Sequence, residues 1–325
     1  MTASAPKNAE RAARTVSRAR LDPFRPQAFF VEAERSAAGD VVSVATVFLT
    51  NRECPWQCIY CDLWKNTTIQ TVPAGAIPAQ IDLALTELGD GSCRQIKLYN
   101  AGSFFDPNAI PPDDFPAIAN HVRGFERVIV ECHPALIGES AVRFRDLLSP
   151  LGTQLEIALG LEVSDDALLA KLNKRMTLAM FEGAAEFLVS RGIHVRAFVI
   201  VKPPFVRTDS EAVDLARRSI DFAFNCGATI VSLIPARFGP DALRDLAKAG
   251  EFAPPSFEAL EESLDYGIAQ ERGRMFADLW DIESLGGCCA CMPERVARLR
   301  EMNLRQVVLP HIICSHAETK CVPVG

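Results

Sequence analysis

From about residue 41 onward, short apolar runs alternate along the chain with stretches whose apolar residues recur at helical spacing. The first run, residues 41–50 (VVSVATVFLT), is too short for a helix and predicts a strand. Six later runs give the same signal, at residues 94–99, 127–132, 155–161, 195–201, 228–234 and 275–279. Nearly continuous apolar runs of this length are typical of parallel strands that are buried on both faces.

The segments between these strands carry the start and stop signals of helices. Thr208 and Glu211 form a capping-box pattern ahead of an apolar stripe, and Gly227 ends that stripe. A second helix is expected between 177 and 192, and a third over about 256–272. Strands and helices that alternate in this way predict a parallel sheet with right-handed crossovers.

The polar residues that follow the strands decide between two parallel architectures. A doubly wound open sheet and a partial or complete (β/α) barrel both fit six or seven β–α units. The barrel is favoured, because polar side chains gather at the carboxyl ends of successive strands, where barrel enzymes place their sites. These residues are Asn100, Glu131, His133, Glu162, Lys202, Arg237 and Asp278. We expect the barrel over 41–282, after a partly disordered leader (1–40) and before a Cys-rich extension (283–325).

Composition sets wide limits. The 325 residues are 49% apolar and carry a net charge of −7, as in an ordinary globular protein. This net negative charge gives no overall attraction to nucleic acid or to an anionic membrane. It does not exclude a local basic groove, because net charge does not report how charges are distributed. No apolar run approaches the roughly 20 residues that span a bilayer. The N-terminus shows no secretory signal, so we expect a cytoplasmic protein.

Three of the eleven cysteines, Cys54, Cys58 and Cys61, share one short loop directly after the first strand. A cubane iron–sulfur cluster normally takes four thiolates, so three would leave one iron open to another ligand. A structural zinc site is the alternative. Zinc usually needs a fourth ligand close by, and no His or Cys follows Cys61 until Cys93. The spacing favours a catalytic cluster.

The pattern Cys-x3-Cys-x2-Cys, with Tyr60 just before the last cysteine, resembles the signature of the radical S-adenosylmethionine (SAM) superfamily. The resemblance covers about residues 41–240 and implies a partial (β/α)6 TIM-type barrel. It implies that the three cysteines ligate a [4Fe–4S] cluster and that Tyr60 lies against the adenine of SAM. In that family an electron, from a donor such as flavodoxin or ferredoxin, cleaves SAM to a 5′-deoxyadenosyl radical that abstracts hydrogen from the substrate.

The other SAM-binding motifs are matched less closely. Where the family often has a Gly-Gly-Glu run, this chain has Asn100, Gly102 and Ser103 and lacks the acid. An ordinary turn explains Gly102 equally well. Glu162, at the end of a strand, resembles the family residue that contacts the ribose, and a carboxylate can accept hydrogen bonds from both hydroxyls.

Residues 172–177 (LNKRMT) resemble a motif of the elongator-catalytic-subunit branch, and the wider match extends toward the archaeosine-synthase radical subunit. The resemblance makes Arg175 the candidate partner of the SAM carboxylate, since guanidinium and carboxylate pair in a bidentate way. A surface arginine at a helix start is the alternative. The branch points to a modified nucleoside or an amino-acid-bearing small molecule as substrate.

Three further polar residues are candidates for contact with that substrate. Glu131 and His133 end one predicted strand, and Asp278 ends the last. Charged residues directly after buried strands can be satisfied core pairs, but at a barrel mouth they are more often functional. We expect catalytic roles for all three, with Arg237 available to grip an anionic group.

The C-terminal cysteines form a second constellation. Cys288 and Cys291 make a Cys-x2-Cys pair, and Cys314 and Cys321 could complete four thiolates. Structural zinc, an auxiliary iron–sulfur cluster and unligated thiols all remain open.

The sequence is also compatible with two functions other than that of a radical enzyme. One is a non-catalytic zinc or iron–sulfur module that acts through protein or RNA partners. The other is a (β/α)-barrel hydrolase whose cysteines are incidental.

Overall fold

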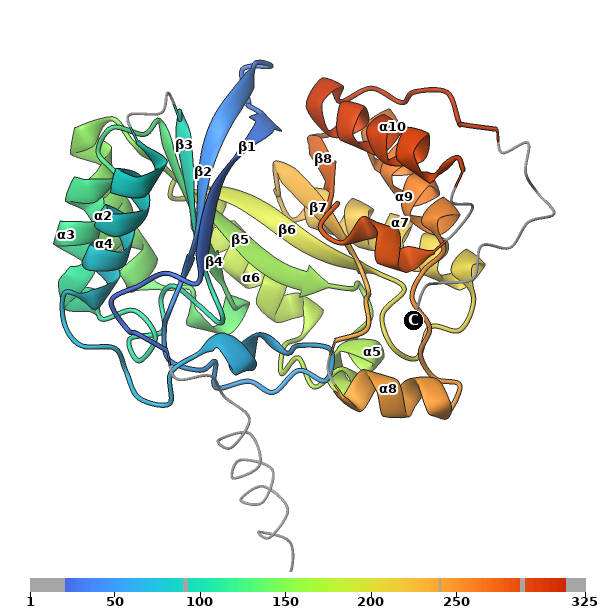
Figure 1. Cartoon of the computed structure of the whole chain (residues 1–325), viewed down its shortest axis with the longest axis horizontal. Helices are drawn as coiled ribbons and strands as arrows, with labels where there is room; N and C mark the ends of the chain where they lie inside the picture. The colour runs from blue at the N-terminus through green and yellow to red at the C-terminus, as the bar shows by residue number, and fades with distance from the viewer. Residues whose placement is uncertain (1–20, 90–92, 240, 287–289, 314–325) are drawn as a thin grey trace, which may run out of the picture. The chain divides into compact units, whose positions relative to one another are not determined.

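The structure is a computed structural model that describes residues 21–89, 93–239, 241–286 and 290–313. The strands are β1 (Ala28–Arg35), β2 (Val41–Leu49), β3 (Gln95–Asn100), β4 (Arg127–Cys132), β5 (Gln154–Glu162), β6 (His194–Val201), β7 (Ile230–Pro235) and β8 (Arg274–Ala277). They follow one another in the sheet in chain order (Figure 1). Pairing is parallel from β2 to β4 and from β5 to β8. This order confirms the predicted partial barrel.

Helices separate the strands. They are α2 (Ala76–Leu88), α3 (Phe115–His121), α4 (Glu139–Leu148), α5 (Asp166–Lys171), α6 (Leu178–Val189), α7 (Asp209–Asn225), α8 (Asp241–Lys248), α9 (Phe257–Ala269) and α10 (Met292–Arg305). The predicted capping box is present, since Thr208 accepts from the Glu211 backbone and Glu211 accepts from the Thr208 backbone. The helices expected over 177–192 and 256–272 are α6 and α9.

All seven predicted strands are present, with ends that shift by up to two residues. β7 begins at Ile230 rather than at 228, because the residues before it turn out of α7 after Gly227, whose φ is 89°. β1 lies inside the segment 1–40 that was expected to be a partly disordered leader. Its alternating apolar and polar residues make a strand that the search for continuous apolar runs did not detect.

The chain divides into two compact units. The first comprises the described residues up to Glu32, then Ser43–Pro55 and Cys61–Leu155. The second comprises Ala33–Val42, Trp56–Tyr60 and the described residues from Glu156 onward.

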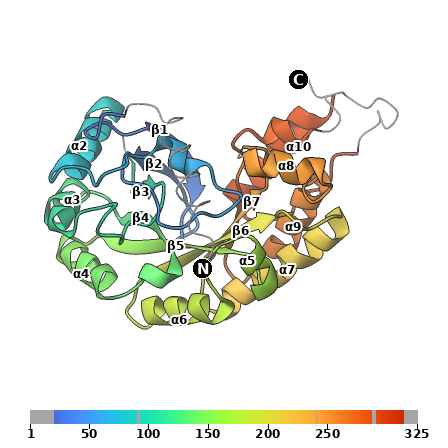
Figure 2. The ribbon, with the colours of Figure 1, turned by 90° about the horizontal axis from the view of Figure 1, so that it is seen from below.

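In the first unit, α2, α3 and α4 form one row along the outer side of the strands (Figures 1 and 2). An aromatic cluster fills the space beneath these helices, with ring centroids between 5.1 and 6.3 Å apart. Its members are Phe104, Phe105, Phe115 and Phe144, all buried. The cluster lies directly after β3 and anchors the loop that carries Asn100, Gly102 and Ser103.

In the second unit, α7 packs against β6, and α9 packs against α7 and β8. The last helix, α10, is held to α9 by ion pairs of two buried arginines. Arg295 pairs with the buried Glu261 and with the exposed Glu258 at 2.7 Å, and Arg298 pairs with Asp265 at 2.7 Å. Charged groups this deeply buried persist only when they are paired, so these contacts fix where α10 lies on α9.

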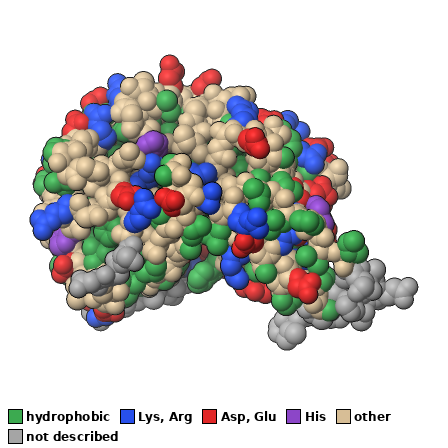
Figure 3. Space-filling view, turned by 90° about the horizontal axis from the view of Figure 1, so that it is seen from above, with side chains coloured by type: hydrophobic (Ala, Val, Ile, Leu, Met, Phe, Trp, Pro, Cys, Tyr) green, Lys and Arg blue, Asp and Glu red, His purple; other side chains and the backbone are tan. Residues whose placement is uncertain are grey.

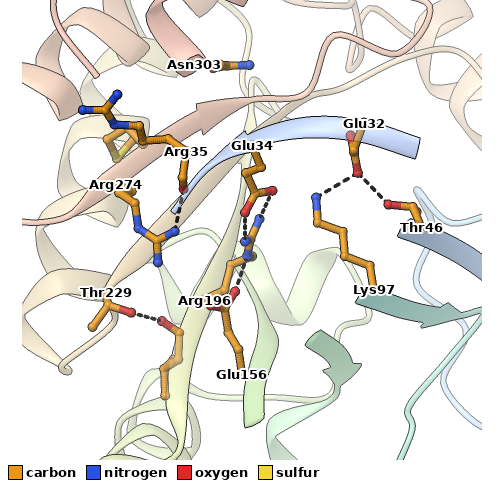
Figure 4. A network of polar contacts seen from close by, with 12 residues as sticks. Glu32, Glu34, Arg35, Thr46, Lys97, Glu156, Arg196, Thr229, Arg274 and Asn303 are labelled. Carbon is orange, nitrogen blue, oxygen red and sulfur yellow. Dashed lines mark hydrogen bonds and ion pairs between the residues drawn. The ribbon is translucent and has the colours of Figure 1, made fainter. Parts of the chain in front are cut away.

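Ion pairs join the amino-terminal halves of β3, β5 and β6 to each other or to the second half of β1 (Figure 4). In the second unit, Arg196 of β6 contacts Glu34 of β1 at 2.5 Å and Glu156 of β5 at 2.8 Å. In the first unit, Lys97 of β3 contacts Glu32 at 2.9 Å. Polar groups at the amino ends of barrel strands serve stability, whereas groups at the carboxyl ends serve function.

Charged side chains of both signs lie on the part of the surface drawn in Figure 3, where acidic and basic groups are interspersed. Within the described residues, no helix is both long and apolar enough to cross a bilayer.

Candidate functional site

The three-cysteine loop follows β2 directly. Cys54 and Cys61 belong to the first unit and Cys58 to the second, and all three are half-buried. In the described part of the chain, no three His, Cys, Asp or Glu side chains are grouped around a metal-sized space. The side chains around each cysteine are therefore described in turn below.

The segment that carries Cys58 is held by the turn after α5. The Ile59 amide donates to the Leu172 carbonyl at 3.2 Å, and the Asn173 side-chain amide donates to the Gln57 carbonyl at 2.6 Å. Asn173 adopts a left-handed backbone with φ of 55°, which Asn tolerates better than most residues. The LNKR sequence thus clamps the residues on both sides of Cys58.

A buried ion pair lies beside Cys58. The Lys174 ammonium contacts the Glu162 carboxylate at 2.6 Å, and both side chains are at most 10% exposed. Burial raises the pKa of the Cys58 thiol, the Lys174 charge opposes that rise, and the Glu162 charge adds to it. Glu162 has a φ of 64° and follows a register shift in β5, so the strand bends where its carboxylate faces Lys174. This strained position is typical of a functional site.

Gly160 makes room for this pair, which gives a testable prediction. A Cβ at residue 160 would overlap the Glu162 carboxylate and would lie 2.5 Å from the Lys174 nitrogen. We expect Gly160→Ala to lower the free energy of unfolding by about 1–3 kcal/mol, because the pair must move. Urea unfolding measures this. Gly183→Ala is the matched control, since it meets open space in α6 and should be neutral or stabilising. Equal effects of the two substitutions would contradict the prediction.

Arg175, the predicted partner of the SAM carboxylate, is exposed. Its Nε donates to the Asn173 side-chain oxygen at 2.7 Å, and its φ is 57°. Sequence reasoning passed over Lys174, which is the buried basic residue of this motif. The sequence did hold a sign that Lys174 is buried, since it lies midway between Leu172 and Met176, two apolar residues that are buried in the structure.

Asn100 and Gly102 lie beside Cys54 in the first unit. Asn100 is 3% exposed, and neither polar atom of its side chain has a hydrogen-bond partner among the described residues. Gly102 has a φ of 145°, and a Cβ there would lie 3.3 Å from the Cys54 Cβ. The close approach of this loop to Cys54 therefore needs glycine. A buried side-chain amide without partners is costly, because its lost hydration is not replaced by hydrogen bonds.

Glu131 and His133, at the end of β4, brace the same loop. The Glu131 carboxylate accepts a hydrogen bond from the backbone amide of Asn100 at 2.6 Å. The backbone amide of His133 donates to the Ser103 hydroxyl at 2.9 Å. His133 Nδ1 accepts from the Ala135 amide at 3.1 Å, so in the neutral ring Nε2 carries the proton. The two predicted catalytic residues thus lie next to the predicted cofactor-binding residues Asn100 and Ser103.

Tyr60 packs against an apolar cluster in the second unit. The cluster consists of Ile200, Ala236, Leu243 and Phe252. The residue as a whole is half-buried.

Asp278 follows β8 and pairs with Arg237, which follows β7. The Arg237 Nη1 to Asp278 Oδ2 distance is 2.9 Å. The other carboxylate oxygen of Asp278 accepts from the Trp280 amide at 3.0 Å. Two of the strand-end residues named from the sequence therefore meet.

Lys202 follows β6 and contacts Asp209, the first residue of α7, at 2.9 Å. Burial disfavours the Asp209 carboxylate, but hydrogen bonds from Lys202 and Ser256 outweigh it and lower the pKa of Asp209. A carboxylate whose pKa falls on folding stabilises the protein above its unfolded pKa, and that stability is lost as the pH falls toward the folded value.

Asp209→Asn should therefore destabilise the protein at pH 7 and destabilise it less at pH 3, below the ordinary Asp pKa of about 3.9. Urea unfolding at the two pH values measures the effect. Asp214→Asn, on the exposed face of the same helix, is the control and should show a smaller pH-dependent difference. A deficit of Asp209→Asn that is as large at pH 3 as at pH 7 would contradict the linkage.

Of the predicted C-terminal ligands, only Cys291 lies within the described residues, where it is buried at the start of α10. Cys288, Cys314 and Cys321 lie outside them. His311, three residues before Cys314, has its Nε2 2.8 Å from the Asp265 carboxylate.

Comparisons with known proteins agree with the resemblance drawn from the cysteine loop. The chain is 27% identical to archaeosine synthase subunit beta of Methanosarcina acetivorans over 275 residues, which is 80% of this chain and 78% of the relative. No family model matches the chain.

Among solved structures, SuiB of Streptococcus suis matches 77% of this chain and 50% of its own length, with 14% identity and a TM-score of 0.50. Coproporphyrinogen III oxidase of Escherichia coli, described as a radical SAM enzyme, matches 81% of this chain and 56% of its own, with 13% identity and a TM-score of 0.47. The likeness to SuiB concerns the fold, a mixed α/β partial barrel. The sequence similarity confirms the resemblance to the archaeosine-synthase branch.

Proposed function

We propose that this chain is a radical SAM enzyme in which Cys54, Cys58 and Cys61 hold a [4Fe–4S] cluster with one open iron. The observation that carries the proposal is the buried Asn100 amide beside Cys54, with neither polar atom partnered in the described residues. The chemistry of the available groups agrees with this proposal. Cysteine thiolates are the usual ligands of iron–sulfur clusters, and the side chain of Asn100 can both donate to a carboxylate and accept from an ammonium group, as the methionine end of SAM requires. When bound, the cluster and SAM supply reductive cleavage to a 5′-deoxyadenosyl radical that abstracts hydrogen.

The residues of this chain would divide the binding of SAM among them. Asn100 and Ser103 would contact the methionine end, with Gly102 allowing backbone approach. Glu162 would accept hydrogen bonds from the ribose, held in place by Lys174 at 2.6 Å. Tyr60 would lie against the adenine.

The SAM carboxylate needs a cation, and two residues of the same turn are available. Lys174 is buried beside Cys58, and Arg175 is exposed and can swing away from Asn173. We assign the carboxylate to Arg175, since Lys174 is engaged by Glu162.

The substrate in this proposal is a modified nucleoside or a related small molecule. The support is the similarity to a protein named archaeosine synthase subunit beta. Glu131, His133 and Asp278 would contact it, because they follow strands at the edge where barrel enzymes bind substrates. The name of the relative indicates a partner subunit, and reduction needs an electron donor such as flavodoxin or ferredoxin. A cytoplasmic location belongs to the same proposal, because the reductant and the oxygen-sensitive cluster are found there.

A second metal site is proposed for the C-terminal cysteines, with zinc or an auxiliary cluster as its occupant. Cys291 would be one ligand. Burial at the start of α10, which Arg295 and Arg298 fix to α9, would hold that thiol in place.

Anaerobic reconstitution with iron and sulfide, followed by reduction in the presence of SAM, tests the proposed function. The expected product is 5′-deoxyadenosine, identified by mass spectrometry, from protein that contains iron and sulfide. Protein that binds zinc alone and leaves SAM intact would instead be a non-catalytic metal module.

A further inference from the structure

Two exposed aromatic rings stand at the carboxyl ends of β7 and β8. Trp280 is 72% exposed and Phe238 is 53% exposed. Phe238 follows Arg237 directly, and Trp280 lies two residues after Asp278. Single exposed rings are common on protein surfaces, but these two stand at the edge of a parallel barrel where substrates bind.

A single carboxylate ties the two loops together. Asp278 Oδ2 accepts from Arg237 Nη1 at 2.9 Å, while Asp278 Oδ1 accepts from the Trp280 amide at 3.0 Å. Arg237 Nη2 also donates to the Asp278 carbonyl at 3.2 Å. We call Arg237, Phe238, Asp278 and Trp280 the aromatic clasp. These bonds join the two loops, so the backbone that carries the two rings is ordered before any ligand arrives.

The clasp continues toward the residue proposed to contact adenine. The Phe238 ring lies 5.2 Å from the Phe252 ring, edge to face at 83°. Phe252 belongs to the apolar cluster on which Tyr60 packs. One connected set of aromatic and apolar side chains therefore runs from Tyr60 to Phe238 within the second unit.

The charges of the clasp limit what it can bind. Asp278 neutralises Arg237, so the clasp offers no net charge to a phosphate or a carboxylate. One buried donor of Arg237, the Nε–H, has no hydrogen-bond partner among the described residues. Flat faces, no net charge and a spare donor complement a neutral planar ring that has acceptors on its edge.

We propose that the aromatic clasp is the binding position for the nucleobase of a nucleoside substrate, with the base stacked on Trp280. This inference rests on the proposed function and names its substrate class. The backbone phosphates of a nucleic acid would have to be bound elsewhere, since the clasp carries no free cation.

Equilibrium dialysis of the reconstituted full chain, in the presence of SAM, tests the clasp with radiolabelled guanosine, adenosine, cytidine and uridine, each used singly. Ribose 5-phosphate is the control ligand. We expect the wild type to retain at least one nucleoside more strongly than ribose 5-phosphate. Trp280→Ala should weaken that binding about tenfold, and Trp280→Phe should keep most of it, because a ring remains. Phe24→Ala removes an exposed ring far from the clasp in sequence and should leave binding unchanged.

A second variant tests the charge argument. Asp278→Asn frees the Arg237 charge and should shift preference from the nucleoside toward its 5′-monophosphate. Retention of no nucleoside by the wild type, or equal effects of Trp280→Ala and Phe24→Ala, would overturn the clasp. Formation of 5′-deoxyadenosine by the wild type reports separately on the proposed function. Nucleoside retention without it would overturn that function and keep the clasp.

Discussion

Replacing Cys58 by Ala is expected to lower the iron content of the reconstituted protein and to abolish formation of 5′-deoxyadenosine. Loss of a residue that merely supports a metal ligand costs about 10–100-fold in affinity or activity, so loss of a ligand should cost about 100-fold or more. Iron and sulfide analysis together with a timed SAM-cleavage assay measures both effects.

Cys226→Ala is the matched control for that substitution. Cys226 is a half-buried thiol at the end of α7, where burial and the charge of Glu182 raise its pKa to about 11. Cys226 lies outside the three-cysteine loop that is proposed to hold the cluster, so this variant should keep its iron and its activity. SAM cleavage that survives in Cys58→Ala would exclude the proposed cluster and favour an ordinary barrel enzyme with incidental cysteines.

Arg196→Met should cause the largest loss of stability, because it leaves two buried carboxylates without their cation. Glu34 and Glu156 are 5% and 1% exposed, and Arg196 contacts both (Figure 4). Removal of one partner from a buried ion pair costs about 3–5 kcal/mol. Urea unfolding at neutral pH should show a decrease of at least this size in the free energy of unfolding.

A triple variant separates charge from packing at this position. In Glu34→Gln/Glu156→Gln/Arg196→Met the buried charges are gone, and most of the lost stability should return. A triple variant as unstable as Arg196→Met would show that the shape of the arginine, rather than the ion pairs, holds these strands. Arg143→Met, on α4, is a surface control that should change stability little.

The strands could be predicted because parallel strands buried on both faces are continuous apolar runs. The segment 127–132 predicted β4 at its correct ends, and the run 41–50 predicted β2 to within one residue. β1 was missed because Glu32 and Glu34 interrupt its apolar residues. Glu34 is buried by pairing with Arg196, a partner 162 residues away that no local pattern reveals.

The site was predicted as a set of strand-end residues, and the structure shows which of them meet. Asn100 contacts Glu131, and Arg237 contacts Asp278. Lys174 was missed because two basic residues stand side by side, and the resemblance favoured Arg175. Asn173 and Arg175 both have left-handed backbone conformations, and these decide which of the two basic side chains points inward. A helical pattern in the sequence does not predict such a conformation.

Electron–nuclear double resonance on the reduced, reconstituted protein tests the open iron most directly. With SAM labelled by 17O in its carboxylate, we predict a hyperfine coupling between the label and the reduced cluster, lost when unlabelled SAM replaces it. A cluster signal that SAM leaves unchanged, at SAM concentrations that saturate binding, would mean that no iron is open to the cofactor and would contradict the account.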